Sequence, residues 1–211
     1  MIDVMRGRAC LVRPRNLPNA QMIDADTDAD AALLARYGAG DDTAARLLST
    51  RLLPRIYAHA FRVLGDQAEA EDVAQDAMMR LWQIAPDWRE GEARVTTWLY
   101  RVTANLCTDR LRKRRTTSLD EAAEPADPSP SVAAQMQSAE RAEALQQALQ
   151  TLPDRQRQAV VLRHIEGLGN PEIATILEVG VEAVESLTAR GKRALTAALI
   201  DQRAALGFEG E

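Results

Sequence analysis

Residues 116–131 read TTSLDEAAEPADPSPS, and this stretch constrains the fold of the chain more than any other. It contains three prolines and four acidic residues, no basic residue and no apolar periodicity. Such a composition cannot bury a core, and its prolines favour an extended backbone. We therefore expect residues 116–135 to form a flexible, acidic, proline-rich linker, with a small domain on each side of it.

Both domains are predicted to be all-α. Aromatic residues make up only 4% of the sequence, whereas Ala and Leu are abundant, and no run of alternating β-branched residues indicates a strand. Residues 1–27 scatter arginines and prolines without a helical stripe, so we expect a disordered N-terminal arm there. The first helical domain is predicted over residues 28–115 and the second over residues 136–206.

The most informative predicted helix covers residues 94–115, RVTTWLYRVTANLCTDRLRKRR. Val95, Leu99, Val102 and Leu106 recur at the helical period and define a buried face. The segment has seven basic residues and one acid, although the whole chain has a net charge of −5. Aromatic rings beside cations suit stacking on unpaired bases and neutralisation of phosphates. The alternative interpretation is a core helix with a solvated cationic end.

A second helix is predicted over residues 66–84, where Asp66 and Glu69 have the spacing of a capping box. Its polar face carries Glu69, Asp72, Gln75, Asp76 and Met79. This face is typical of a solvated surface or of a docking surface for a basic partner. A metal site is less favoured, because hard cations draw oxygen ligands from loops or from several elements. We expect neither a metal nor a cofactor.

The second half of the chain predicts a helix-turn-helix. Ala174 lies where the first helix must be small for the second to cross it, and the wedge between the two helices is formed by Val179, Val184 and Leu187. The turn position that usually holds Gly is occupied by Glu178. If its φ is positive, Glu costs roughly 1 kcal/mol relative to Gly. A plain helical hairpin is the alternative.

In their order along the chain, these motifs resemble the bacterial sigma factors of the extracytoplasmic-function (group IV) type. The first half is similar through LLPRIYAHAFRVLGDQAEAEDVAQDAMMRLW and REGEARVTTWLYRVTANLCTDRLRKRR. The second half is similar through LPDRQRQAVVLRHIEGL, PEIATILEVGVEAVESL and ARGKRAL, so the resemblance covers about residues 30–205. It implies a non-enzymatic factor that binds core RNA polymerase and directs promoter-specific transcription initiation. It further implies a stress response under the control of an anti-sigma factor.

The resemblance also implies roles for particular residues. On the acidic helix, the contact with core polymerase would be made by Asp72, Gln75, Asp76 and Met79. The −10 promoter element would be recognised and opened by Arg94, Trp98, Tyr100, Arg101, Asn105, Arg110, Arg112 and Lys113, with Trp98 alternatively a core residue. The −35 element would be read in the major groove by Glu182, Ala183, Glu185, Ser186 and Arg190. Many relatives have Lys or Arg near Glu185 and Leu187, so the bases that are read stay open.

The net charge of −5 argues against a freestanding, high-affinity duplex binder, because such affinity comes largely from phosphate neutralisation. Dependence on polymerase for promoter binding accounts for the acidity. The two cysteines, Cys10 and Cys107, lie far apart without metal-ligand spacing, and no stretch is apolar enough to span a bilayer. We therefore expect a reduced cytoplasmic protein with no disulfide and no membrane insertion.

Two other functions are compatible with parts of the sequence. A conventional helix-turn-helix regulator that acts without polymerase would need a dimerisation or ligand-sensing domain, and residues 30–115 instead carry a basic helix with aromatics. A metal-dependent nuclease could use Asp66, Glu69, Asp72 and Asp76, but the sequence has no convincing second element to supply ligands.

Overall fold

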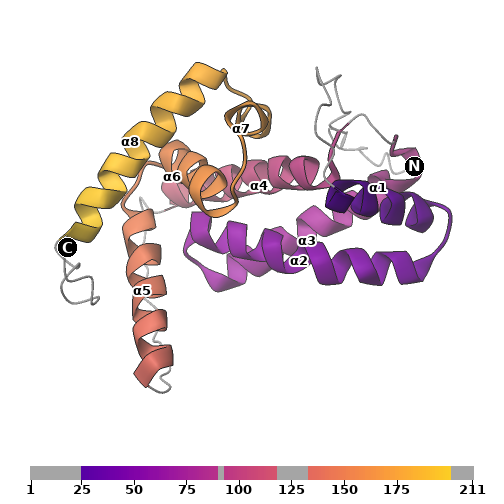
Figure 1. Cartoon of the computed structure of the whole chain (residues 1–211), viewed down its shortest axis with the longest axis horizontal. Coiled ribbons are helices and arrows are strands. Elements are labelled where there is room, and N and C mark those ends of the chain that lie inside the picture. The colour runs from indigo at the N-terminus through magenta and orange to yellow at the C-terminus, as the bar shows by residue number, and fades with distance from the viewer. Residues whose placement is uncertain (1–24, 90–92, 118–132, 201–211) are drawn as a thin grey trace, which may run out of the picture.

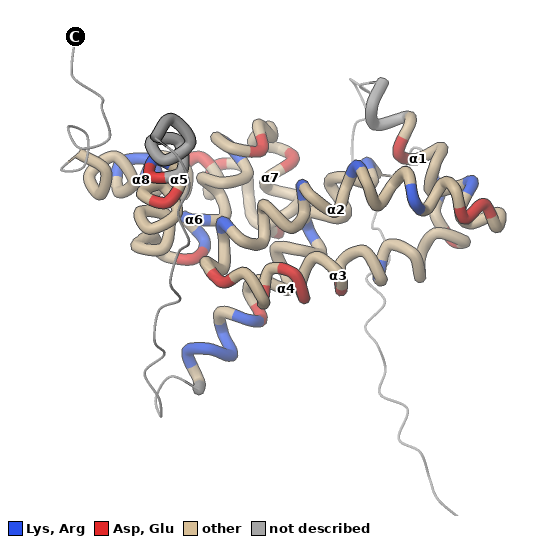
Figure 2. Tube along the Cα trace, turned by 90° about the horizontal axis from the view of Figure 1, so that it is seen from below, with Lys and Arg blue, Asp and Glu red and all other residues tan. Residues whose placement is uncertain are grey.

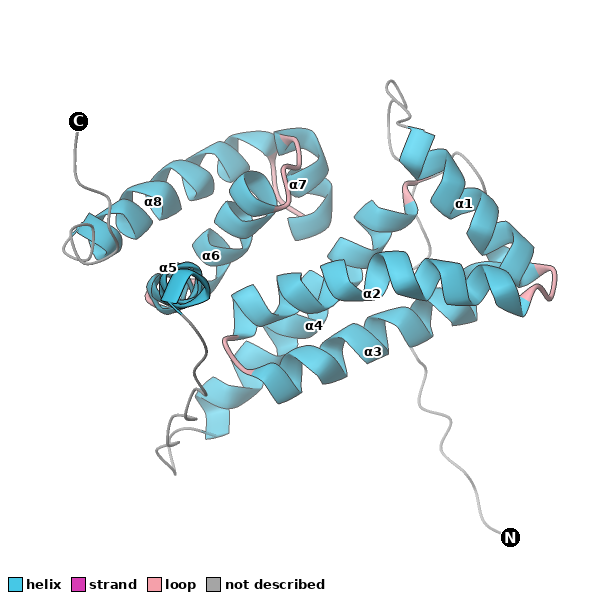
Figure 3. Cartoon of the chain, turned by 60° about the horizontal axis from the view of Figure 1, so that its bottom comes forward, coloured by secondary structure: helices cyan, strands magenta, loops and turns pink. Residues whose placement is uncertain are grey.

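The computed structural model describes residues 25–89, 93–117 and 133–200, and these residues form helices joined by short turns (Figure 1). The first half contains α1 (Ala25–Gly38), α2 (Asp42–Leu64), α3 (Gln67–Ile84), the short 3₁₀ turn η1 (Ala85–Asp87) and α4 (Val95–Thr117). The second half contains α5 (Ala133–Gln150), α6 (Asp154–Val160), a π-helical continuation η2 (Val161–Ile165), α7 (Asn170–Leu177) and α8 (Val181–Ile200). No strand occurs in these ranges, so the all-α prediction is confirmed (Figure 3). None of the described helices has the length and apolar character that crossing a bilayer requires.

The boundaries of α2 and α3 follow from local capping. The Asp41 carboxylate accepts hydrogen bonds from the backbone N–H groups of Thr43 and Ala44, at 2.9 and 3.3 Å, and so caps α2. The helix ends at Gly65, whose φ of 71° is easily reached only without a Cβ atom. Asp66 then caps α3 by accepting the N–H of Glu69 at 2.8 Å, as the sequence pattern predicts.

The predicted arm and linker lie largely outside the described residues. The structure does not describe residues 1–24, and residues 25–27 already belong to α1, three residues before the predicted start of the first domain. Residues 118–132 are also outside the described part, but α4 continues to Thr117 and α5 begins at Ala133. The predicted linker is therefore too long at both ends. Helices propagate readily through alanines such as those that open α5, because each added residue gains a backbone hydrogen bond.

The core of the first half lies between α2, α3 and α4. Leu48, Leu52 and Ile56 of α2 and Leu81 of α3 are at most 2% exposed, and they face Leu99 of α4, which is fully buried. Each such side chain contributes roughly 1.5–3 kcal/mol on transfer from water. These contacts fix the position of α4 on α2 and α3.

A smaller cluster holds the second half together: its buried members are Leu149, Leu152, Val160 and Val161. Here α8 crosses α6 at Gly191, where an added Cβ atom would lie 2.5 Å from Cγ2 of Val160. The close crossing of these two helices therefore requires glycine.

The largest core cluster is shared by both halves of the chain. It contains Trp98 and Val102 of α4 together with Ile173 and Ile176 of α7. Figure 1 shows α7 beside α4, and α6 near the ends of α2 and α3 (Figure 1). The two domains that the sequence predicts are therefore packed against each other, and this arrangement decides which candidate residues face solvent.

Candidate nucleic-acid and polymerase interfaces

The basic helix forms as the sequence predicts. Val95 and Leu99 of α4 are fully buried, Val102 is 7% exposed and Leu106 packs at the edge of the same core. Thr103 and Thr108 satisfy their hydroxyls on carbonyl groups one turn earlier, both at 2.8 Å. The buried stripe therefore leaves the cationic residues on the remaining faces of one continuous helix.

The residues predicted to bind the −10 element divide into two groups along α4. The C-terminal group faces solvent: Asn105, Arg112 and Lys113 are exposed and Arg110 is half-buried. Figure 2 shows lysines and arginines gathered on the end of α4 that extends beyond the body of the molecule (Figure 2). The N-terminal group consists of Arg94, just before the first residue of α4, with Trp98, Tyr100 and Arg101, and it lies against the second half of the chain.

Trp98 and Tyr100 are buried in this arrangement, so neither ring is available to stack on a base. Trp98 is 7% exposed and meets Trp88 edge to face, with ring centroids 6.3 Å apart. Both indole N–H groups are buried without a hydrogen-bond partner. Trp88 is not among the site residues predicted from the sequence. Its position in the loop just before the basic helix is the signal that would have identified it.

Tyr100 is 1% exposed and packs edge to face on His59, with ring centroids 5.2 Å apart. Its hydroxyl donates a hydrogen bond to Oε2 of Glu166 at 2.6 Å. Burial, and then this carboxylate, raise the pKa of Tyr100 well above its usual range. Burial, and then the nearby charge of Arg62, lower the pKa of His59 to about 3, and neither ring nitrogen has a hydrogen-bond partner.

Three glutamates of the second half contact the N-terminal group. Glu172 accepts a hydrogen bond from the Thr97 hydroxyl at 2.5 Å and lies 4.0 Å from Nη1 of Arg94. Glu178 accepts from Nε of Arg101 at 2.9 Å and also from its Nη2.

The third glutamate, Glu166, accepts from Tyr100 and from Arg62, the latter at 3.3 Å. With a side chain only 9% exposed, Glu166 is the most buried of the three.

The acidic face predicted to dock on polymerase is open. Asp72, Gln75, Asp76 and Met79 are all exposed on α3, and Met79 is 57% exposed despite its apolar side chain. An exposed methionine among carboxylates suits a protein contact better than a solvated surface. Asp72 also lies 3.3 Å from Arg110, so this face borders the cationic end of α4.

Three of the four carboxylates of the nuclease alternative, Asp66, Glu69 and Asp72, have structural partners. Asp66 caps α3, and Arg114 lies 2.9 Å from Glu69 and 3.9 Å from Asp66. Within the described residues, no group of three or more His, Cys, Asp and Glu side chains is arranged to hold a metal ion. Cys107 is buried, and burial raises the pKa of its thiol to about 12.

The helix-turn-helix geometry appears in α7 and α8. Ala174 and Val184 are buried at the crossing of the two helices, as predicted. Glu178 ends α7 in the left-handed region, with φ 55° and ψ 47°, so the predicted strain at this turn is present. The residues predicted to read the −35 element all lie exposed on α8: Glu182, Ala183, Glu185, Ser186 and Arg190.

Comparisons with known proteins agree with this division of the chain. Residues 48–117 match the Sigma-70 region 2 family and residues 142–195 match the Sigma-70, region 4 family. The ECF RNA polymerase sigma factor SigW of Bacillus subtilis is 32% identical over 158 residues, which cover 70% of this chain and 84% of that protein.

Two solved structures have a similar fold. The structure of CnrH in complex with the cytosolic domain of CnrY matches with a TM-score of 0.61 at 27% identity, covering 82% of this chain and 99% of that chain. The sigma factor RpoE of Bartonella quintana, solved with the anti-sigma factor NepR, matches with a TM-score of 0.58 at 22% identity, covering 73% of this chain and 95% of that one.

Proposed function

This chain belongs to the extracytoplasmic-function (ECF) sigma factors of bacterial RNA polymerase, and on that premise we propose how its helices divide the work of promoter recognition. The chain acts in the cytoplasm as an initiation factor and not as an enzyme. It binds core RNA polymerase through α3, opens the −10 element with α4 and reads the −35 element with α8.

The observation that carries this proposal is the exposure of three separate chemical surfaces on three helices. The α3 surface is acidic with an exposed methionine, the C-terminal half of α4 is cationic, and the early turns of α8 present short polar and acidic side chains. A conventional helix-turn-helix regulator has no need of the first two surfaces. Their presence on the same chain favours a factor that joins polymerase to promoter DNA.

On α3, Asp72, Gln75, Asp76 and Met79 form the docking face for core polymerase. Carboxylates at one edge of a protein interface give orientation and a fast association rate, while the methionine supplies apolar contact. D76K reverses one of these charges without disturbing the buried side of α3. It is expected to weaken binding to core polymerase more than the same charge change at exposed Glu143 of α5.

On α4, the phosphates of the −10 strand are held by the C-terminal group, Asn105, Arg110, Arg112 and Lys113. Its unstacked bases are contacted by the N-terminal group, Arg94, Trp98, Tyr100 and Arg101. The second group is covered in the arrangement described above. Base contact therefore requires the two domains to separate.

An anti-sigma factor controls the chain by binding when the two domains are together. The segment between α4 and α5 spans residues 118–132, which is long enough to allow both a packed and a separated arrangement. A pull-down from unstressed cells is expected to recover a small protein partner in place of polymerase. Recovery of polymerase alone under every condition would remove the need for such a partner.

Run-off transcription tests the proposed function as a whole. Purified core polymerase, a genomic promoter library and the full-length chain are expected to yield a defined set of transcripts that depend on the chain. R112A/K113A is expected to reduce transcription from every promoter, whereas R141A, which removes a cation from α5, serves as its control. Tight, sequence-specific duplex binding by the free chain at physiological salt would contradict the proposal.

A further inference from the structure

We propose that the second domain of this chain autoinhibits the first: Glu166, Glu172 and Glu178 occupy the side chains of α4 that contact the −10 strand, and leave the polymerase face and the −35 helix open. We call these three residues the acidic ladder. This inference rests on the proposed function. It requires no other protein, because every contact comes from the chain itself.

The acidic ladder follows the basic and polar side chains of α4 along about two turns. Its members are spaced six residues apart, and their partners on this side are Arg94, just before α4, and Thr97, Tyr100 and Arg101 within it. A carboxylate and a phosphate present the same kind of anionic oxygens to guanidinium and hydroxyl donors. The ladder therefore engages guanidinium and hydroxyl donors that would otherwise be free to contact a DNA strand.

The backbone conformation of Glu178 is the strongest structural argument that its contact with Arg101 has a role. It is the only non-glycine residue with a positive φ in the described part of the chain, and Gly would adopt this conformation without strain. Glycine has no carboxylate to pair with Arg101. A strained residue whose side chain reaches another domain points to a role for that contact.

The end of α2 adds a second set of contacts that depend on the closed arrangement. The last carbonyls of a helix have no partner within it. Here the carbonyls of three consecutive residues accept side-chain donors from the second domain: Gln146 to Phe61 at 2.9 Å, Gln150 to Arg62 at 3.1 Å and Arg157 to Val63 at 2.5 Å. The second domain therefore adds donors at the end of α2, where the Phe61 carbonyl also accepts the N–H of Gly65 and the Leu64 carbonyl accepts from Arg114.

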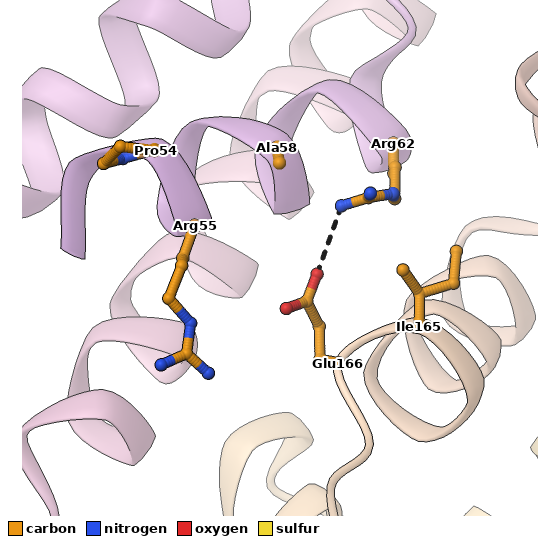
Figure 4. Close-up of a pocket in the computed structure, with 6 residues that line it drawn as sticks. All are labelled: Pro54, Arg55, Ala58, Arg62, Ile165 and Glu166. Carbon is orange, nitrogen blue, oxygen red and sulfur yellow. Dashed lines mark hydrogen bonds and ion pairs between the residues drawn. The ribbon is translucent and has the colours of Figure 1, made fainter. Parts of the chain in front are cut away.

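A hollow beside the ladder gives solvent access to the Glu166–Arg62 pair, in addition to the more exposed Glu178–Arg101 pair. Figure 4 shows Arg62 directed at Glu166, with Arg55 on the other side of the carboxylate (Figure 4). The hollow here has a volume of about 290 Å³ and is lined by Pro54, Arg55, Ala58, Arg62, Ile165 and Glu166. Ions can reach this pair, so the closed arrangement should weaken as salt rises.

The closed arrangement cannot engage a whole promoter. The −10 and −35 elements lie roughly 25 base pairs apart, which is about 85 Å along B-form DNA, whereas Glu178, just before the −35 helix, contacts Arg101 on the −10 helix. The polymerase face of α3 is open in this arrangement. Core polymerase can therefore dock first, and placing the two domains at their separate sites breaks the ladder and uncovers α4.

Intramolecular fluorescence energy transfer between α3 and α8 tests the autoinhibition without polymerase or promoter. The two dyes are attached to cysteines that replace exposed Gln83 and Ala194, in the variant Q83C/A194C. Cys10 is removed by C10S, whereas Cys107 can stay because it is buried. The triple variant E166Q/E172Q/E178Q should lower the transfer efficiency by shifting the closed-to-open ratio about tenfold, which corresponds to about 1.4 kcal/mol. A matched control, E71Q/E140Q/E143Q, removes the same charge from exposed positions and should keep the wild-type efficiency.

A single variant, E178G, distinguishes a loss of autoinhibition from a loss of stability. It removes the Arg101 contact and relieves the strain at the turn, so it should open the protein while the melting temperature of the second domain stays unchanged or rises. Unchanged transfer in both E178G and the triple variant would overturn the autoinhibition, as would an equal loss of transfer in the control. If the variants open but no run-off transcript is obtained with any of them, the closed arrangement held by the acidic ladder is supported and the proposed function is rejected.

Discussion

The guanidinium of Arg157 donates to the main-chain carbonyl of Val63, 94 residues earlier in the chain, at 2.5 Å. Arg157 is only 5% exposed, and it also donates to the carbonyls of Gln150 and Leu152, at 2.9 and 3.0 Å. One buried cation therefore ties the end of α2 to the turn between α5 and α6. Charge-assisted bonds of this kind stabilise a fold mainly because removing the donor leaves buried acceptors unsatisfied.

We expect R157A to lower the free energy of unfolding by about 2–4 kcal/mol, since three carbonyls and the side chain of Gln150 lose their donor. Urea unfolding followed by circular dichroism measures this. R155A, at the exposed neighbouring arginine, should change the free energy by less than about 0.5 kcal/mol. If R157A and R155A change the free energy of unfolding equally, the hydrogen bonds of Arg157 do not contribute to stability.

A second prediction concerns the crossing of α6 and α8. G191A places a Cβ atom 2.5 Å from Cγ2 of Val160 and 3.1 Å from the carbonyl oxygen of Gln156, so it should destabilise the second domain by about 1–3 kcal/mol. Thermal unfolding measures the loss, and G180A, whose Cβ would meet no atom within 4 Å, is the control. V160A should restore part of the loss in the double variant by making room. Additive effects of V160A and G191A would show that Val160 is not the obstacle.

A third prediction concerns pH. His59 has a folded-state pKa of about 3, below the usual 6.5, so the unfolded chain binds a proton that the folded chain excludes. The stability is fully present above pH 6.5 and falls as the pH drops toward 3. Between pH 7 and pH 5, the loss is about 2 kcal/mol.

H59F should remove this part of the pH dependence, because the buried imidazole has no polar partner and packs as an aromatic ring on Tyr100. Urea unfolding at pH 7 and pH 5 compares the variant with the wild type. H164Q, at the other histidine, lies on an exposed part of η2 and should retain most of the wild-type slope. A slope that survives in H59F would assign the pH dependence to other groups.

The sequence predicts the helices of this protein well because their signals are local. Asp41, Gly65 and Asp66 act on backbone groups within a few residues, and the stripe of Val95 and Leu99 follows from the helical period alone. Glu178 was identified as a turn residue from the spacing of the helix-turn-helix. Its positive φ follows from the same local geometry.

The burial of Trp98 and Tyr100 could not be predicted in the same way. Trp88 and His59 pack on these rings from within the first half, but Ile173, in the same core cluster as Trp98 and Tyr100, and Glu166, which accepts from the Tyr100 hydroxyl, lie on the far side of the linker. A linker of unspecified conformation carries no information about which surfaces it brings together. The periodicity of α4 alone therefore left the aromatic side chains equally compatible with base stacking and with a core.

The last prediction concerns base recognition by α8. Glu182 lies exposed in the first turn of this helix, where its carboxylate also interacts favourably with the helix dipole. Phosphates repel a carboxylate, so Glu182 is tolerated against DNA only if it faces base edges, and in the major groove it can accept a hydrogen bond from the amino group of cytosine. E182Q should then relax the preference at one −35 position, at a cost of roughly 1–3 kcal/mol of discrimination, and leave the −10 preference unchanged. Run-off transcription from a library randomised over the −35 element measures the profile, and E143Q, on exposed α5, is the control. A −35 profile that does not change in E182Q would assign Glu182 to the stability of the helix end, and a thermal shift of E182Q relative to the wild type would then measure that role.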